Sequence, residues 1–213
     1  MAEKINYQKK MEEIIKRHEK AEEVPTLLLH SCCGPCSTYV LEYLSKYFRI
    51  SLVYYNPNIY PEKEYYFREA EQRALIDKMD TKYPIDFIAS DYKPEDYYEA
   101  VKGHEKDREG GERCLLCYSL RFREAARICK EKNFDYFTTT LSISPHKNSQ
   151  VLNKLGEQIA EEYGVKYLYS DFKKKNGFKR SVELTCDYNM YRQDYCGCVF
   201  SLKEARERLN NDK

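Results

Sequence analysis

The chain has 213 residues, of which 42% are apolar and 33% charged, and its formal net charge is +1. This balance excludes an intrinsically disordered chain and a wholly basic protein that binds nucleic acid through its overall charge. Residues 1–20 are charged without the apolar core of a signal peptide, and no apolar run is long enough for a membrane span. We therefore expect a soluble, cytoplasmic protein.

Helical and strand patterns alternate along the chain. Residues 3–22 predict a helix with an apolar stripe that includes Ile14 and Ile15, and Pro25 ends that segment. The further predicted elements, in chain order, are strand 26–30, helix 36–47, strand 50–55, helix 61–80, strand 85–89, helices 94–103 and 114–132, strand 134–140, helix 145–163, strand 166–169, and helices 178–191 and 200–210.

This alternation, with crossovers of more than a dozen residues, predicts an α/β fold. We expect an open, mostly parallel, doubly wound (Rossmann-like) sheet with flanking helices, in a single domain over 1–213. Its C-terminal helical segment, about 172–210, is expected to bind metal. Ligands of such sheets bind at the carboxyl ends of the strands. The residues that follow the predicted strands include Cys32, Cys33, Cys36, Asn56, Asn58, Asp91, Thr139, Thr140, Ser144 and Asp171.

Seven of the nine cysteines form three groups, Cys32-Cys33-x-x-Cys36, Cys114-x-x-Cys117 and Cys196-x-Cys198. An odd total in an intracellular protein argues against a disulfide scaffold and for metal or redox chemistry. Thiolates are soft ligands, and one cubane iron–sulfur cluster takes four of them. The remaining three suffice for a second metal with an open position, or two of them for a redox disulfide. An iron–sulfur enzyme is our leading hypothesis.

Two alternatives stay open. Two C-x-x-C pairs can hold a structural zinc ion in a binding module, although such a site needs neither Cys32 nor the C-G-C turn. Cys33-Gly34-Pro35-Cys36 is also the dithiol sequence of thioredoxin-like thiol–disulfide oxidoreductases, but this chain is longer and has no tryptophan.

Several residues are expected to have no part in the chemistry. Cys129 lies about 18 Å along its predicted helix from Cys117, at ~1.5 Å per residue. Cys186 has helical spacing with Val182 and Met190, which predicts a small core residue. His30 follows a buried strand and is expected to be a satisfied core histidine. His146 is expected to face solvent at a helix N-terminus, and Asp171 fits a turn former as well as it fits a functional role.

The residue blocks of this chain, taken together, resemble the QueH-type epoxyqueuosine reductases from about residue 28 to 201. The blocks are His30-x-Cys32-Cys33-x-Pro35-Cys36-Ser37, Tyr55-Asn56-Pro57-Asn58-Ile59, Gly111-x-Arg113-Cys114-x-x-Cys117-Tyr118, Thr139-Thr140-Leu141-x-x-Ser144-Pro145-x-Lys147-Asn148, Lys179-Arg180-Ser181 and Tyr191-Arg192-Gln193-x-Tyr195-Cys196-Gly197-Cys198-x-Phe200-Ser201. Their order and joint presence make the resemblance specific.

The resemblance implies removal of the epoxide oxygen from epoxyqueuosine at the tRNA wobble position, without cobalamin. It implies a [4Fe-4S] cluster, with a second mononuclear iron or a redox-active cysteine pair beside it. The implied partners are tRNA and an unidentified electron donor. By motif, the cluster ligands are Cys32, Cys33, Cys114 and Cys117, and the second redox element is Cys196 with Cys198. Some relatives carry aspartate in place of Cys36, which suggests that this residue binds the second iron.

Further site residues are predicted around this centre. The proton donor is sought among Asp194, Tyr191, Asp171 and His146. Substrate contacts are predicted for Asn56, Asn58, Arg113, Thr139, Thr140, Ser144, Lys147, Asn148, Lys179, Arg180, Arg192 and Gln193. The basic run 173–180, followed by tyrosines, suggests an RNA contact, although a solvated loop is the commoner meaning. Arg68 and Arg113 fit either phosphate contacts or surface ion pairs.

ATP chemistry is not expected in this chain. Its strand order resembles that of adenine-nucleotide hydrolase-like domains, but loop 30–35 contains only one glycine.

Overall fold

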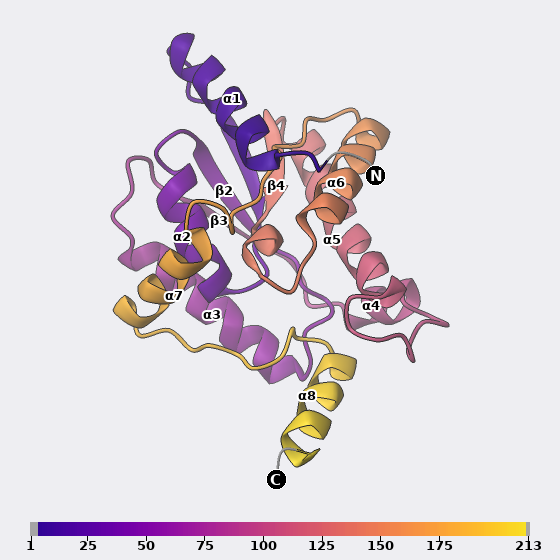
Figure 1. Ribbon diagram of the computed structural model, residues 1–213. Helices are drawn as coiled ribbons and strands as arrows, with labels where there is room; N and C mark the ends of the chain where they lie inside the picture. Colours follow the sequence, from indigo (N-terminus) through magenta and orange to yellow (C-terminus); the bar gives the residue numbers. More distant parts are fainter. Residues whose placement is uncertain (1–3, 212–213) are drawn as a thin grey trace.

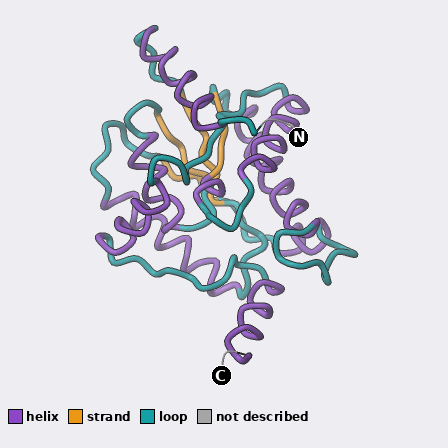
Figure 2. Tube along the Cα trace, in the orientation of Figure 1, coloured by secondary structure: helices purple, strands orange, loops and turns teal. Residues whose placement is uncertain are grey.

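The centre of the fold is a four-stranded, all-parallel open sheet. The computed structural model describes residues 4–211. The strands are β1 (Thr26–His30), β2 (Arg49–Tyr54), β3 (Asp86–Ala89) and β4 (Tyr136–Thr139), in the order β3-β2-β1-β4. Helices surround this sheet, as Figure 2 shows, so the predicted α/β, Rossmann-like fold class is confirmed.

Helices pack against both faces of the sheet because its strands are apolar on both sides. In β1, the side chains of Leu27 and Leu29 join one core and that of Leu28 joins the other. The first core includes α1 (Tyr7–Lys20), α2 (Gly34–Leu44) and α3 (Glu62–Lys78). The second includes α5 (Glu112–Glu131) and α6 (Ser149–Tyr163).

The remaining helices lie around this central unit (Figure 1). They are α4 (Pro94–Ala100), the short 3₁₀ helix η1 (Thr140–Ile143), α7 (Gly177–Asp187) and α8 (Val199–Asn211). α7 packs against α2, and the segment between α7 and α8 runs alongside α3. No helix within the described residues is long and apolar enough to cross a membrane.

The strand order places a topological switch point between β1 and β4. From β1 the chain adds β2 and β3 on one side, and β4 then pairs with β1 on the other side. Ligand sites of open α/β sheets form at the carboxyl ends of the strands at such a point. Cys32 follows β1 and Thr140 follows β4, and the backbone N–H of Cys32 donates to Thr140 Oγ1 at 3.2 Å.

The predicted fifth strand at 166–169 is wrong, because this segment makes only one bridge, between Phe137 and Tyr167. Side chains replace the next strand hydrogen bonds. Asn153 accepts from the backbone N–H of Ser170 at 2.8 Å and donates to its carbonyl oxygen at 2.7 Å. Thr138 Oγ1 donates to the carbonyl oxygen of Leu168 at 2.8 Å.

Two predicted helices differ in their bounds. The helix predicted from 145 begins at Ser149, because Asn148 accepts from the N–H of Gln150 and caps α6 there. The helix predicted to reach 191 ends at Asp187, and Asn189 adopts a left-handed conformation with φ of 50°. Met190 therefore leaves the helix, and the predicted core position of Cys186 is wrong, since this residue is exposed. The other bounds differ by up to a few residues.

Candidate metal centre

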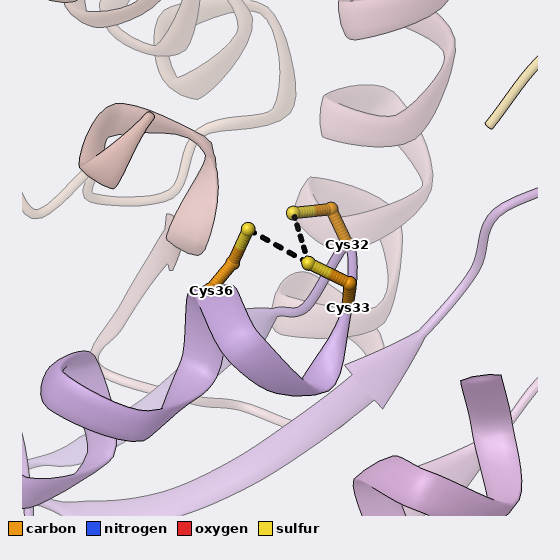
Figure 3. Close-up of side chains that lie close together, drawn as sticks. All are labelled: Cys32, Cys33 and Cys36. Atoms are coloured by element: carbon orange, nitrogen blue, oxygen red, sulfur yellow. Dashed lines mark hydrogen bonds between the residues drawn. The ribbon is translucent and has the colours of Figure 1, made fainter. Parts of the chain in front are cut away.

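Three cysteines converge at the end of β1 (Figure 3). Cys33 is the N-cap of α2, and Pro35 lies in the first turn, where its missing N–H costs nothing. The Sγ atoms of Cys32 and Cys33 lie 3.9 Å apart, and those of Cys33 and Cys36 lie 2.7 Å apart. Among residues 4–211, these three form the group whose ligand atoms all lie within 4.8 Å of one another. This geometry suits one soft metal ion.

His30, immediately before this turn, is a satisfied core residue as predicted. It is fully buried, and its two ring nitrogens hydrogen-bond Thr139 Oγ1 and the carbonyl oxygen of Tyr55, both at 3.1 Å. Burial lowers the pKa of His30 to about 4, so the ring is neutral at pH 7. Both nitrogens serve the fold, which leaves the three thiols as the groups at this strand end that could hold a metal ion.

The three thiols do not share one protonation behaviour. Hydrogen bonds from Cys33 and then Cys36 hold the pKa of Cys32 well below its ordinary value. The hydrogen bond with Cys32 raises the pKa of Cys33 to about 12. The pKa of Cys36 is also raised, first by its hydrogen bond with Cys32. The group therefore carries one thiolate easily and resists further deprotonation until a cation compensates the charge.

A second group contains the other four of the seven cysteines. Cys114 and Cys117 lie one turn apart near the start of α5, and the backbone N–H of Gly110 donates to Cys114 Sγ at 3.2 Å. Together with Cys196 and Cys198 they line one small cavity. Burial raises the pKa of Cys117 to about 12. These four thiols are less tightly gathered than the first three.

The loop 188–198 carries Cys196 and Cys198, and α3 together with the segment before it holds this loop in place. Arg68 donates to the carbonyl oxygen of Cys196 at 3.4 Å, and the N–H of Tyr191 donates to Glu71 at 3.0 Å. Just before α3, the N–H of Tyr60 donates to the carbonyl oxygen of Gly197 at 2.8 Å. The Tyr195 hydroxyl donates to the carbonyl oxygen of Tyr60 at 2.6 Å. These four hydrogen bonds set the position of the C-G-C turn.

A cavity of about 580 Å³ opens beside the thiols. Cys32, Cys33, Cys36 and Cys196 all line it. Lys147 also lines it and places its Nζ 3.7 Å from Cys196 Sγ. Because Cys196 lines both the large and the small cavity, the two thiol groups are neighbours. The volume lies within the range of cavities that hold a small molecule or a nucleoside.

Some of the predicted substrate contacts and proton donors line this cavity. They are Ser144, His146, Lys147, Arg192, Gln193 and Asp194. Gln193 Oε1 is buried and has no hydrogen-bond partner, so it is available to a ligand. Tyr191 instead turns towards α3, where its ring meets that of Phe67 at 5.1 Å. Asp171 is buried behind the cavity, bound to Ser149 and Lys173.

Several other predicted substrate contacts have their polar groups engaged within the chain. Asn56 donates to the carbonyl oxygen of Ser31 at 2.8 Å. The side chains of Thr139 and Thr140 are buried and Asn148 caps α6, whereas Asn58 lines the small cavity and its buried Oδ1 has no hydrogen-bond partner. Lys179 is exposed outside the cavity lining, and Arg180 pairs with Glu42 at 2.7 Å. These residues shape the walls of the site or lie away from them.

The proposed surface ion pairs of Arg68 and Arg113 are in fact buried. Each side chain is only 2–3% exposed. Arg68 pairs with Glu64 at 2.8 Å, and Arg113 pairs with Glu204 at 2.9 Å. The Arg113 guanidinium thus ties α5 to α8.

Two lysines of the basic run 173–180 make contacts within the protein. Lys173 Nζ donates to the carbonyl oxygens of Ser142 and Lys147, and Lys175 pairs with Glu12 at 2.5 Å. The cations at the large cavity are instead Lys147, Arg192 and Arg208, together with the buried Arg121.

The residues of the site that sequence reasoning missed include Phe178, Arg208 and Arg121. A signal for Arg121 is present in the sequence, because it stands four residues after Cys117 in the same predicted helix. That spacing places both side chains on one helix face. No comparable local pattern indicates Phe178 or Arg208, which reach the cavity from separate helices.

Comparison with known proteins shows the family of this chain. A family model described as "Epoxyqueuosine reductase QueH" matches residues 27–204. The chain belongs to the QueH family. A QueH protein named epoxyqueuosine reductase from Streptococcus pyogenes serotype M1 is 44% identical over 202 residues, which cover 94% of this chain and 79% of the relative. The resemblance inferred from the cysteine blocks is thereby confirmed.

Two further QueH relatives carry the same name. The protein from Staphylococcus epidermidis is 43% identical over 202 residues, which cover 93% of this chain and 85% of the relative. The protein from Thermotoga maritima is 34% identical over 189 residues, which cover 86% of this chain and 93% of the relative. The similarity therefore spans most of the chain, including all three cysteine groups.

The donor set of this QueH chain fits a thiolate-bound metal. Its seven thiols comprise a close group of three and a looser group of four, which meet around Cys196. Buried cations face them, since Lys147 lies 3.7 Å from Cys196 Sγ and the unpaired Arg121 Nη2 belongs to a residue that lines both cavities. Such cations offset the negative charge that several thiolates bring to a metal site.

Proposed function

We propose that this protein reduces epoxyqueuosine to queuosine at the wobble position of tRNA, with an iron–sulfur centre held by its seven grouped cysteines. The observation that carries the proposal is the convergence of these thiols on two adjoining cavities, the larger of about 580 Å³, at the switch point of the sheet. Membership of the QueH family, whose relatives are named for this reaction, supports it. Unpaired thiols and a tRNA substrate fit a cytoplasmic protein.

The reaction consumes two electrons and two protons, breaks the two C–O bonds of the epoxide, forms the C=C bond of queuosine and releases water. An iron–sulfur centre supplies electrons one at a time when bound. The chain must provide a proton at the leaving oxygen. Asp194 and His146 line the cavity, whereas Tyr191 and Asp171 point elsewhere. We assign the proton supply to Asp194 or His146 for this reason.

The seven thiols divide into four cluster ligands and three others in either of two ways. The family resemblance assigns the cluster to Cys32, Cys33, Cys114 and Cys117. The shared small cavity favours Cys114, Cys117, Cys196 and Cys198 instead. Either division leaves three thiols for a mononuclear iron or a redox-active pair. The variants Cys33→Ala and Cys198→Ala separate the two, since each removes a cluster ligand in one division only.

The partner of the cavity is the anticodon loop of a tRNA. Arg192 places positive charge at the cavity, as phosphate contacts require, whereas Arg208 pairs with Glu109 there at 3.7 Å. Phe178 also lines the cavity, and the Arg192 guanidinium lies over its ring at 5.7 Å, so an aromatic ring and a cation, the groups that stack on bases, stand together there. The electron donor is a separate one-electron carrier or, in the assay, a chemical reductant.

The proposal is tested by anaerobic reduction of tRNA that carries epoxyqueuosine. Protein reconstituted with iron and sulfide should convert it to queuosine under a chemical reductant, as read by nucleoside mass spectrometry. Cys114→Ala should lose both iron and turnover, whereas the exposed Cys186→Ala should keep both. Stoichiometric zinc without iron would indicate the zinc-binding module. Thiol–disulfide exchange without queuosine would indicate the thioredoxin-like alternative.

A further inference from the structure

Arg121 is a buried cation without an acidic partner. Its side chain is 2% exposed, and its Nε donates to the carbonyl oxygen of Cys117 at 3.2 Å. Nη1 donates to Asn56 Oδ1 at 3.4 Å, and Nη2 has no partner. Among the residues that the structure describes, no carboxylate forms an ion pair with it, whereas the buried Arg68 and Arg113 each have one.

A guanidinium in this state is costly for the fold. Burial removes its hydration, and neutral oxygens return only part of the lost interaction energy. Buried charges are therefore normally paired with an opposite charge or with a metal site. No carboxylate of the described residues pairs with Arg121, so the opposite charge must come from the thiolates of the site and from what they bind.

The position of Arg121 identifies the source of that charge. It lies on the face of α5 that also carries Cys114 and Cys117, because Cys117 and Arg121 stand three and seven residues after Cys114. It lines both the large and the small cavity, as does Tyr118, whose ring lies 5.5 Å from the guanidinium. Arg121 thus stands between the two thiol groups.

We propose that Arg121 is the fixed counter-cation of the metal centre and that its charge raises the reduction potential of that centre. This inference rests on the proposed function, because it needs an anionic iron–sulfur centre on the neighbouring thiols. A positive charge nearby favours the state with one more electron, and low dielectric strengthens the effect. Charge and hydrogen bonding around the sulfurs are established determinants of cluster potential. Arg121 is a positioning residue for charge and does not contact the substrate.

Three variants separate charge from packing. Arg121→Gln keeps polarity and loses the charge, Arg121→Met keeps bulk and loses both, and Arg121→Lys keeps the charge. Arg123→Gln is the matched control, since Arg123 lies on the same helix but is 44% exposed and pairs with Glu162. Each protein is reconstituted with iron and sulfide, its iron content is measured, and its potential is determined by a spectroscopically monitored redox titration.

For the Gln and Met variants, we expect the equilibrium constant for one-electron reduction to fall by about tenfold, which is a shift of about 59 mV to lower potential. Arg121→Lys and Arg123→Gln should stay within about threefold of the unchanged protein. Without metal, Arg121→Met should melt at least as high as the unchanged protein, because the unpaired charge is gone. A cluster retained by Arg121→Lys but lost by the Gln and Met variants would also support the counter-charge.

Other results would overturn the inference. Unchanged potentials in fully loaded Gln and Met variants would do so, as would an equal shift in Arg121→Lys or loss of iron from all three. An equal shift in Arg121→Lys, or loss of iron from all three variants, would indicate that Arg121 has a structural role and links α5 to Asn56. If the unchanged protein binds iron but produces no queuosine, the proposed reaction fails while the potentials still decide the role of Arg121. If it binds no iron, both proposals fail.

Discussion

Replacement of Gly197 by alanine should disable the C-G-C turn without unfolding the protein. Gly197 has a φ of +139°, a conformation that residues with a side chain rarely adopt. A Cβ atom built there would lie 3.3 Å from both the Asn58 amide nitrogen and Ile59, and 3.4 Å from Arg68. These neighbours are buried, so they have little room to move.

The magnitude follows from the backbone strain. A residue with a side chain in so sparsely populated a region costs about 1–3 kcal/mol, to which the close contacts add. If the loop relieves the strain by leaving its position, the ratio of correctly placed to displaced turns falls roughly 5- to 150-fold. Turnover of reconstituted Gly197→Ala should fall by up to that factor, because Cys196 and Cys198 lie on either side of the substitution.

Gly164→Ala is the control for this experiment. Gly164 also has a positive φ, +69°, but it ends α6, and a Cβ atom there would meet nothing within 4 Å. Both variants place a side chain at a positive φ and should lower the thermal stability, while Gly197→Ala alone loses queuosine formation. Full turnover in Gly197→Ala, or an equal loss of turnover in both variants, would refute the reasoning.

Three other predictions concern stability and RNA binding. Cys129→Ala should lower the free energy of unfolding by about 1 kcal/mol in urea and keep all iron, whereas Cys186→Ala should change neither, because Cys129 is buried and Cys186 is exposed. Arg192→Ala should weaken tRNA binding and reduce the slope of log K against log salt by about one, whereas Lys175→Ala should leave that slope unchanged; equal slopes for the two variants would contradict this. Burial raises the pKa of Asp135, but the stronger sum of its hydrogen bonds to the first residue of β1 and of nearby cations lowers it. A lowered folded pKa stabilises the protein above the unfolded value of about 3.9. The advantage in urea midpoint over Asp135→Asn should therefore be present at pH 6 and lost as the pH falls from there through the lower folded pKa.

The strand–turn–helix units were predictable because their signals are local. A buried apolar run followed by Cys-Gly-Pro-Cys indicates the end of β1 and the start of α2, and both lie within two residues of the prediction. The fifth strand failed for a non-local reason. Asn153, on α6, occupies the hydrogen-bonding groups of Ser170 that a neighbouring strand would have used.

The grouping of the cysteines was beyond local signals as well. Spacing identified the seven residues, but their arrangement depends on how loop 188–198 docks on α3. Arg68 and Cys196, which meet there, are 128 residues apart in sequence. The left-handed turn at Asn189 that releases this loop from α7 has no glycine or proline to mark it.

The way loop 188–198 docks makes the stability of the site different from the stability of the sheet. The sheet is held by a continuous apolar core on both faces, whereas the loop is held by a few hydrogen bonds to α3 and the segment before it and by the packing of Tyr188 and Met190 against the first core. Segments of this kind open at a small fraction of the free energy of global unfolding. In mild denaturant, the last two thiols should therefore become reactive to alkylating reagents while the far-ultraviolet spectrum still reports an intact fold. A thiol-binding agent can therefore react with Cys196 and Cys198 while the rest of the protein stays folded.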